Sequence, residues 1–525
     1  MNNNQYIYKQ PPMGRMMPPP MQKRSQGWRE RWMRRFGMSP STTLLRHGEL
    51  TIPNWFSGRA MIFFFVAMFA CWGTLGYVPS SNLFLTASLS AVLFFYGGMS
   101  MSKSWSHTKE RAFLKYVYIV GFIVRFLWVI YIYYIFNPDN YGTTIGDGAD
   151  VEWYMPFGKD LALWLSGNSK YTFSQIMDMN KAAIDDTGYP MWLGIVYSIF
   201  GVENDVFIPY LIKCIAGAYC AICIYRVAKR HFGEGTARMA AIFVCLNPNM
   251  IYWCGTMMKE AEMVFLCCVF IDEVDKALST NRFAFKDLWL GLLAGLALFF
   301  FRAALGVSAF IAVFAHIVMA SNRVMSMGKK IIAGVLVFVT LLVGVGDSLR
   351  AKTELMFETA QSSETQRENM EFRAEREGGN KFAEYAGAAV FAPLIFTIPL
   401  PTFNQALATQ YTQMQLSGGS YIKNILSFFV IIVMLMMLIS GEWRRHVFIL
   451  AYTVGYLAVL VVSSFAQSGR FHMPVMPMLM LFAAYGVQIA KGNAILKKWF
   501  PIVLVVEVFV CLVWNWFKLA GRGMV

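Results

Sequence analysis

Charged residues are scarce in this sequence: Asp, Glu, Lys and Arg make up 15% of its 525 residues, whereas 57% are hydrophobic. Several enzyme motifs are also missing, because the chain contains no P-loop, no GxGxxG after a strand, no HExxH and no GxSxG. The mean hydropathy of +0.46 excludes an ordinary soluble protein. Many runs reach the roughly 20 apolar residues that a transmembrane helix needs. The sequence therefore predicts an all-α polytopic membrane protein.

Cysteine is also uncommon, and its placement argues against a disulfide framework. The nine cysteines fall almost entirely inside apolar runs. Cys220 and Cys223 form a CxxC within a predicted span, but no histidine or second CxxC lies nearby to complete a zinc site. We expect these cysteines to be small core residues.

Basic residues are concentrated before the first long apolar run. Residues 1–59 carry ten Lys or Arg and two acidic residues, Glu30 and Glu49. The net charge of this segment is more than half of the chain's net charge of +15. A segment rich in Pro, Met and Gln with this charge is typical of a disordered cytoplasmic tail that touches anionic lipid. Nucleic acid is a weaker candidate, because few aromatic residues interleave the charges. We predict such a tail at 1–58, no nucleic-acid partner, and a first span that is an uncleaved anchor.

About thirteen segments are long and apolar enough to be transmembrane helices. They are 59–78, 82–101, 115–136, 207–225, 237–253, 260–275, 288–303, 305–320, 331–347, 421–440, 447–465, 473–490 and 499–517. Short loops rich in Lys and Arg separate many of them, and such loops stay in the cytoplasm. Placing all of them inside requires that segment 190–202 does not cross and that 288–320 forms two short helices turning near Arg302. Two long loops then share the outer face.

This topology divides the chain into five parts. They are the tail at 1–58, an N-terminal transmembrane hairpin at 59–114, a transmembrane core at 115–346 that includes the first outer loop at 137–189, a second outer loop at 347–420, and C-terminal transmembrane helices at 421–525. The two outer loops are expected to bear amphipathic helices, such as 156–165, and an apolar, Pro-rich interfacial segment at 391–401.

Three carboxylates lie within six residues of the first outer loop: Asp147, Asp150 and Glu152. Acidic residues directly after a hydrophobic helix are costly at a membrane surface, which indicates chemistry rather than packing. One of them could accept a proton from a hydroxyl group, or help to hold a divalent metal through oxygen ligands. The alternative is a solvated loop or a helix N-cap, for which Asp is favoured.

Isolated cations share the predicted outer face with these carboxylates. Lys259-Glu260 interrupts an apolar stretch, and Arg302 is the lone guanidinium of a long apolar run. Arg470 and His472 precede a helix with two prolines in its first turn. Fixed cations at a helix start or in a membrane suit a phosphate group. The alternatives are a polar turn, an arginine that extends to the interface and a structural histidine.

The order of these motifs resembles that of the GT-C glycosyltransferases, polytopic enzymes that use polyprenyl-phosphate-linked sugars. The similarity is greatest to the branch with family 39, the aminoarabinose transferases and the protein O-mannosyltransferase-like proteins. The matching motifs, over roughly 115–490, are Asp147 or Asp150 with Tyr154, Tyr189-Pro190, Arg230-His231-Phe232-Gly233 and Arg470-Phe471-His472-Met473-Pro474-Val475-Met476-Pro477. The chain also departs from the family. Lys259-Glu260 replaces an Arg-Asp or Arg-Glu pair, the hairpin at 59–114 is an addition, and Asp147 and Asp150 lie seven and four residues before Tyr154, which leaves both open as the matching aspartate.

The resemblance implies a GT-C-like fold whose core at 115–346 is catalytic. It also assigns roles to residues: Asp147 or Asp150 would be the base, with Glu152 as a third catalytic candidate; Lys259, Arg302, Arg470 and His472 would bind the donor phosphate; Tyr154, Tyr189 and Glu260 would contact the substrate. Tyr189-Pro190 could instead simply start a helix. No cofactor is required by the sequence, and the need for a divalent metal stays open.

We therefore expect a membrane glycosyltransferase that moves a sugar from a polyprenyl-phosphate donor to a glycan, lipid or protein acceptor at the non-cytoplasmic face. The bacterial character of the relatives implies the inner membrane, with a cytoplasmic N-terminus. One alternative is a polymerase or ligase for a lipid-linked polysaccharide, which would differ only in the acceptor. Another is a lipid or glycolipid flippase, which predicts charges near mid-membrane and a polar path open to both faces.

Overall fold

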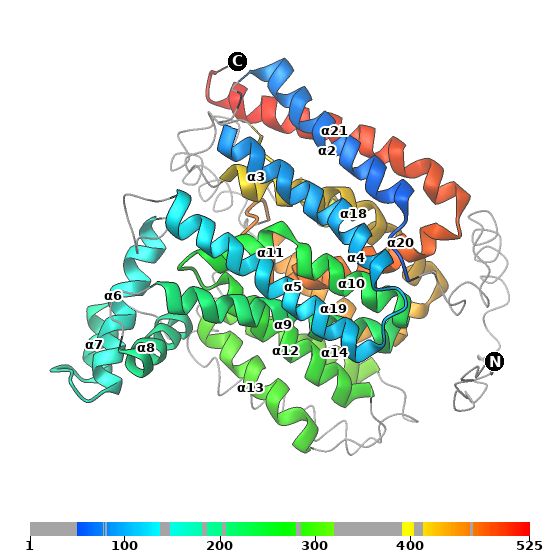
Figure 1. The fold of residues 1–525 in the computed structure, drawn as a ribbon. Coiled ribbons are helices and arrows are strands. Elements are labelled where there is room, and N and C mark those ends of the chain that lie inside the picture. Colours follow the sequence, from blue (N-terminus) through cyan, green and yellow to red (C-terminus); the bar gives the residue numbers. More distant parts are fainter. Residues whose placement is uncertain are drawn as a thin grey trace, which may run out of the picture.

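The computed structural model describes residues 50–76, 78, 81–136, 148–180, 186–201, 206–279, 285–319, 391–403, 413–462 and 466–524. Within these ranges every regular element is a helix, as predicted (Figure 1). The predicted span at 331–347, most of the tail at 1–58 and most of the second outer loop at 347–420 lie outside the described residues.

The helices follow one another with short connections. The α-helices are α2 (Asn54–Leu75), α3 (Ser81–Val92), α4 (Gly98–Ser104), α5 (Glu110–Ile130), α6 (Gly148–Leu165), α7 (Phe173–Met179), α8 (Gly188–Phe200), α9 (Phe207–Phe232), α10 (Glu234–Leu246), α11 (Pro248–Tyr252), α12 (Glu260–Ser279), α13 (Phe285–Phe301), α14 (Ala303–Met319), α18 (Gln413–Ser440), α19 (Val447–Val462), α20 (Met476–Lys491) and α21 (Ala494–Gly521). Shorter π and 3-10 elements are η2 (Leu93–Gly97), η3 (Tyr131–Phe136), η5 (Trp253–Gly255), η7 (Ala392–Leu394), η9 (Glu442–Arg445) and η10 (Met473–Val475).

Seven helical segments of the described chain are long and apolar enough to cross a membrane. They are Asn54–Leu75, Phe84–Ser104, Glu110–Tyr134, Phe207–Phe232, Gly418–Ser440, Met473–Lys491 and Ala494–Gly521. The shorter apolar helices Leu288–Phe301, Ala303–Met319 and Val447–Val462 accompany them. The chain is therefore a multi-pass membrane protein. The number thirteen remains a prediction, because α12 carries several charges and α10 has only 13 residues.

The predicted span at 237–253 is two helices rather than one. Asn247 caps α11 through its side chain, which accepts a hydrogen bond from the backbone N–H of Met250, and Pro248 occupies the first turn. Pro248 has no N–H for the Val244 carbonyl of α10. The buried guanidinium of Arg125 supplies the missing donor, with Nη2 3.3 Å from the Val244 oxygen and Nη1 3.0 Å from the Cys245 oxygen. A lone arginine inside α5 thus completes the end of α10.

The predicted pair of short helices within 288–320 is present as α13 and α14. Arg302 lies between them, and each helix has 17 residues. The two helices contact one another, so the chain reverses direction at Arg302. This turn brings a cation to the end of the pair.

Helix α8 covers most of the predicted segment 190–202 and is shorter than a membrane span. Its 13 residues span about 20 Å at 1.5 Å per residue, which is less than a hydrocarbon core of about 30 Å. Lys213 of the next helix, α9, contacts Tyr189 at the start of α8. The beginnings of α8 and α9 therefore lie at the same end of the molecule. Helices α6, α7 and α8 form a group at one end of the molecule (Figure 1). At Gly194 an added Cβ would lie 2.9 Å from Leu161, so this glycine allows α8 to pack closely on α6.

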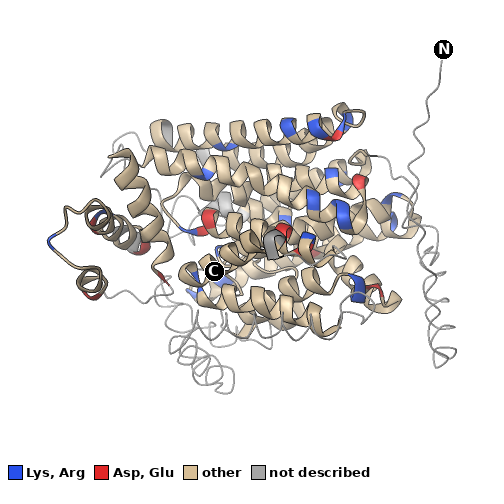
Figure 2. Cartoon of the chain, turned by 90° about the horizontal axis from the view of Figure 1, so that it is seen from below, with Lys and Arg blue, Asp and Glu red and all other residues tan. Residues whose placement is uncertain are grey.

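The short basic turns gather at the opposite end of the helices. Arg238 donates to the Trp105 and Thr108 carbonyls at 2.8 and 2.7 Å, and Lys229 pairs with Glu110 at 2.5 Å. Figure 2 shows many Lys and Arg residues toward this end. These contacts agree with the predicted grouping of the basic loops on one side. The nine cysteines are free and buried, as expected.

Candidate functional site

Five segments that are far apart in the sequence meet at the end of the bundle that bears α6 and α8. They are the first turn of α6, the residues before α8, the turn that leads into α12, the α13–α14 junction and the loop before η10. Each contributes a charged side chain, and we call the group formed by Asp150, Asp186, Lys259, Glu260, Arg302 and Arg470 the charge cluster. Five of the six were candidates from the sequence, and Asp186 was not.

Arg470 joins two carboxylates of the charge cluster. Its Nη1 lies 2.5 Å from Oδ2 of Asp150, and its Nε donates to Oε1 of Glu260. Glu260 is fully buried in the first turn of α12, where the helix dipole favours a negative charge. Burial alone would lower the pKa of Arg470, but Glu260 and Asp150 raise it above its ordinary value. Arg470 is therefore a permanent cation with a buried counterion on one side and a partly exposed one on the other.

Lys259 pairs with Asp186, which the sequence interpretation did not single out. The Lys259 side chain is 6% exposed, whereas that of Asp186 is 46% exposed. Burial lowers the pKa of Lys259, Asp186 opposes this shift, and the positive charge of Arg302 adds to it. The signal that could have found Asp186 is a pair of aspartates just before the Gly188-Tyr189-Pro190 helix start.

Tyr154 lies at the centre of the cluster. Lys259 Nζ is 5.8 Å from the centroid of its ring, and the ring meets that of Tyr189 edge-on with centroids 5.0 Å apart. Burial, together with the negative charges of Asp186 and Glu260, raises the pKa of Tyr154 well above its ordinary value. Its hydroxyl therefore stays protonated and can act as a hydrogen-bond donor.

Arg302 differs from the other two cations because no carboxylate of the described chain pairs with it. Its Nη1 lies 3.3 Å from the hydroxyl of Tyr456, and its guanidinium lies 4.2 Å from the centroid of the Phe471 ring. A guanidinium over an aromatic face is held in place while its outer N–H groups keep their hydrogen-bonding capacity. Among the described cations of the cluster, Arg302 is thus the one without a counterion.

His472 does not contact the charge cluster through any hydrogen bond that the structure describes. The residue is fully buried, and its Nε2 lies 2.6 Å from the carbonyl oxygen of Ala466. Burial and the nearby charge of Lys423 lower the pKa of His472, so the ring is neutral. Its phosphate-binding role stays a prediction.

The two remaining acidic candidates cannot be placed in the site. Asp147 lies outside the described residues, and only the backbone of Glu152 is described, in α6. The structure does bring together most of the other candidates: Asp150, Tyr154, Tyr189, Lys259, Glu260, Arg302 and Arg470. Within the described chain no group of three His, Cys, Asp or Glu side chains has the arrangement of a metal site.

An apolar groove begins beside the charge cluster. A cavity of ≈ 650 Å³ lies between α8, α9, α12 and α13, and Thr187 and Gly188, which follow Asp186, form part of its wall. A second cavity of ≈ 390 Å³ lies farther along α9, α12 and α13. Phe265, Leu266 and Ala297 line both, so the two cavities are neighbours along α12.

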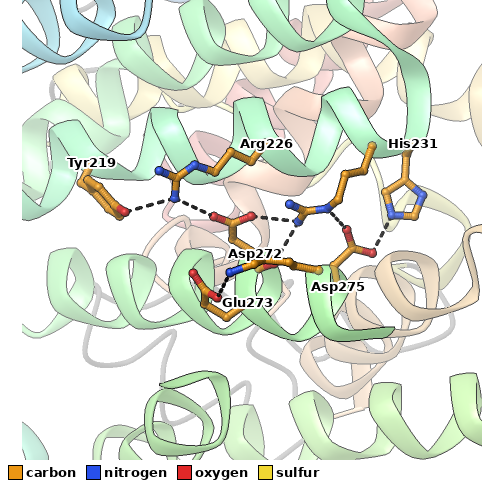
Figure 3. A network of polar contacts seen from close by, with 8 residues as sticks. Tyr219, Arg226, His231, Asp272, Glu273 and Asp275 are labelled. Atoms are coloured by element: carbon orange, nitrogen blue, oxygen red, sulfur yellow. Dashed lines mark hydrogen bonds and ion pairs between the residues drawn. The ribbon is translucent and has the colours of Figure 1, made fainter. Parts of the chain in front are cut away.

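The Arg230-His231-Phe232-Gly233 motif lies at the opposite end of the molecule. Arg230 bonds to Asp275 at 2.6 Å and to Asp272 at 2.8 Å, and His231 Nε2 lies 2.7 Å from Asp275 (Figure 3). Arg226 also pairs with Asp272, at 3.2 Å. The network joins α9 to α12 at the end of the helices that carries the basic turns. Its charges are satisfied by one another, which indicates a structural role.

The described chain is a multi-pass helical membrane protein, and part of its sequence is similar to a family of membrane mannosyltransferases. Residues 188–345 match the family described as dolichyl-phosphate-mannose-protein mannosyltransferase. This segment is less than a third of the chain, and it runs from the start of α8 past Lys259, Glu260 and Arg302. No curated protein matches the chain.

Several solved structures of an archaeal oligosaccharyltransferase are similar to this chain. One is AglB from Archaeoglobus fulgidus in complex with an inhibitory peptide and a dolichol-phosphate, with 11% identity, 78% of this chain and 56% of that chain covered, and a TM-score of 0.41. Another is the apo form of the Archaeoglobus fulgidus oligosaccharyltransferase, with 13% identity, the same coverage and a TM-score of 0.40. The chain spans about half the length of these proteins.

Proposed function

We propose that the protein transfers a sugar from a polyprenyl-phosphate donor to a hydroxyl acceptor at the non-cytoplasmic face of the membrane. The observation that carries this proposal is the position of Arg302, a cation without a described carboxylate partner, close to carboxylates and to an apolar groove. A phosphate on a lipid chain needs these two environments side by side. In a bacterium the membrane would be the inner one, with the N-terminus in the cytoplasm.

The cations of the cluster would bind the donor phosphate unequally. Arg302 is available without displacing a partner, and its planar guanidinium can bind two phosphate oxygens at once. Lys259 and Arg470 are already neutralised by Asp186, Asp150 and Glu260. They would add to the positive field around the phosphate as charge develops on the departing group.

The lipid chain of the donor would lie in the groove along α12. From Glu262 at the first cavity to Glu273 at the second is about 16 Å of helix at 1.5 Å per residue. Apolar side chains such as Phe265 and Leu266 line this length, so a hydrocarbon chain is a suitable occupant. The groove starts beside Asp186, which would place the phosphate at the charge cluster.

A carboxylate of the cluster would act as general base. The acceptor oxygen forms a bond to the anomeric carbon and its proton passes to the carboxylate, while the bond from this carbon to the phosphate oxygen breaks and its electron pair leaves with the lipid phosphate. Asp150 and Asp186 are the described candidates, because their side chains are 41% and 46% exposed and an acceptor can reach them. Asp147 stays a third candidate from the sequence. Glu260 is too buried for this role.

A flippase remains the alternative from another class, because buried ionisable side chains occur inside candidate spans. Arg125 and Lys423 are fully enclosed, but both donate to backbone carbonyls of neighbouring segments. Glu507 of α21 contacts Ser427 at 3.4 Å. Each of these three side chains has at least one hydrogen-bond partner, and none of them lines either described cavity, which favours the transferase.

The proposal is tested with purified wild type and the variants Asp150→Asn and Asp186→Asn. Turnover of a radiolabelled polyprenyl-phosphate sugar is followed with and without acceptor extracts. Loss of a general base should lower kcat by about 100- to 10,000-fold in one variant, while binding of the lipid is kept. Asp160→Asn is the matched control, because Asp160 lies on α6 beside Asn180 and outside the cluster. Lipid binding without any turnover by the wild type would favour a flippase instead.

A further inference from the structure

A buried lysine lies directly beneath the charge cluster. Lys213 is in the second turn of α9, and its side chain is fully buried. It belongs to none of the motifs that the sequence singles out, although it interrupts an apolar helix. A buried ammonium in such a position requires partners for its charge and for its three N–H groups.

Three oxygen atoms occupy the three N–H donors of Lys213. The ammonium donates to the hydroxyl of Tyr189 at 3.0 Å, to the Thr256 carbonyl at 2.7 Å and to the Met258 carbonyl at 2.6 Å. Glu262 lies 3.5 Å away and balances the charge. With every donor used, Lys213 has none left for a substrate.

The partners of Lys213 are the backbone segments that carry the site. Thr256 and Met258 form the turn that leads directly into Lys259 and Glu260. Tyr189 follows Asp186 by three residues, at the start of α8. One ammonium therefore ties together the two segments whose side chains, Lys259 and Asp186, pair at the cluster.

The start of α8 is also fixed against the segment before Arg302. A Cβ added at Gly188 would lie 2.5 Å from the Phe301 ring and 2.9 Å from the Phe300 carbonyl oxygen, so the chain approaches α13 as closely as a glycine allows. Movement of Tyr189 would therefore also disturb the distance between Asp186 and Arg302. The contacts of Lys213 extend in this way to three residues of the charge cluster.

We propose that Lys213 is a positioning residue for the donor-phosphate site. Its side chain lines the apolar cavity, but it holds Lys259, Asp186 and Arg302 in register without donating a hydrogen bond to the phosphate. This inference rests on the proposed function in one respect only, that Lys259 and Arg302 face the phosphate. Glu262, 3.5 Å from the Lys213 ammonium, is the second member of the pair. A Lys213→Met single variant would leave Glu262 as a buried, unpaired acid, so it must be compared with a Lys213→Met/Glu262→Gln double variant.

The first measurement follows Lys259 itself and needs no turnover. The purified full-length protein is treated with a small amine-reactive reagent, and modification of Lys259 is quantified by peptide mass spectrometry. In the wild type Lys259 is protected by burial and by Asp186. In both Lys213 variants the reagent should modify Lys259 at least fivefold faster than in the wild type. An unchanged rate in both would overturn the inference, whatever the enzyme does.

The second measurement separates positioning from general loss of structure. With a polyprenyl-phosphate sugar as substrate, the double variant should raise KM at least tenfold and change kcat less than threefold. Arg125→Met is the matched control, because Arg125 is a buried cation that also donates to backbone carbonyls but lies in α5. It should lower thermal stability without changing Lys259 labelling or KM. Equal effects of Arg125→Met and the double variant would contradict a positioning role.

The two measurements also keep this inference distinct from the proposed function. Faster Lys259 labelling in a protein without transferase activity would support the positioning contact and overturn the proposed function. Unchanged labelling and an unchanged KM in an active enzyme would overturn the positioning contact and support the proposed function.

Discussion

The three cations of the charge cluster differ in how their charge is neutralised. Arg470 has a fully buried counterion in Glu260, Lys259 has a half-exposed one in Asp186, and Arg302 has Tyr456 and the face of Phe471. A cation that is already paired offers less to an incoming anion, because the anion must compete with the carboxylate. Arg302 should therefore contribute most to donor affinity per side chain.

Replacement of Arg302 by Met should lower kcat/KM for the donor more than replacement of any other arginine. A hydrogen bond to a charged group contributes about 1.5–3 kcal/mol, which corresponds to a roughly 10- to 100-fold lower kcat/KM for the lipid-phosphate donor. Steady-state kinetics with a short-chain polyprenyl-phosphate sugar measures this. Arg302→Lys should recover part of the loss, because it restores the charge but not the planar fork. Arg444→Met, an exposed arginine near the opposite end, is the control, and a similar effect there would refute the assignment.

Single residues were predictable from the sequence where a charge interrupts an apolar run. Lys259, Arg302 and Arg470 stand out for this reason, and the structure brings them together. Lys213 also interrupts an apolar helix, but nothing in the sequence indicates that its partners are carbonyls 43 and 45 residues away. Asp186 belongs to a pair of aspartates in a polar loop before a helix start, which is a weaker signal than a charge inside an apolar run. Pairing of side chains is a property of the fold and cannot be obtained from composition.

At the level of elements, the predicted helices that fall within the described residues are present, but the one at 237–253 is divided. Hydropathy averaged over 237–253 indicates a single span, because both halves are apolar. Asn247-Pro248 is a helix start by its residue types, since Asn is a favoured N-cap and Pro a favoured first residue. The helix-start residues Asn247 and Pro248 therefore decide the structure here rather than the mean hydropathy of 237–253. Arg125 from another helix stabilises the break.

Arg125→Met should destabilise the protein more than its conservative shape suggests. It removes the donor to the Val244 and Cys245 carbonyls, and a buried carbonyl left without a partner costs about 1–3 kcal/mol. Thermal unfolding in detergent should show a clearly lower Tm. Ile123→Val on the exposed side of the same helix is the control, since Ile123 is 45% exposed and makes no such bonds. Equal melting temperatures for the two variants would show that Arg125 does not support α10.

For the whole molecule, the two ends of the bundle have different chemistry. One end carries basic turns tied by ion pairs, and the other carries the charge cluster and the group of α6, α7 and α8. This separation agrees with the orientation expected from loop charge, because basic turns remain in the cytoplasm. The second outer loop, which lies largely outside the described residues, should join the charge cluster on its side.

Cysteine labelling in sealed membrane vesicles tests this orientation. The native cysteines are free and buried, so their background reaction with a membrane-impermeant thiol reagent should be low. Asn168→Cys, at an exposed position after α6, should react from the non-cytoplasmic side. His107→Cys, exposed between α4 and α5, should react from that side only after the vesicles are opened. Reaction of both residues from one side of intact vesicles would invalidate the topology.

The shortness of α13 and α14 has a consequence for the bilayer around the site. Seventeen residues correspond to about 25 Å, a few ångströms less than an average hydrocarbon core. A bilayer adapts to a short helix pair by becoming thinner beside it. The headgroup layer would then dip toward Arg302, and a lipid phosphate would arrive at the guanidinium without being lifted out of its leaflet. In this sense the protein shapes the membrane so that the donor approaches from within it.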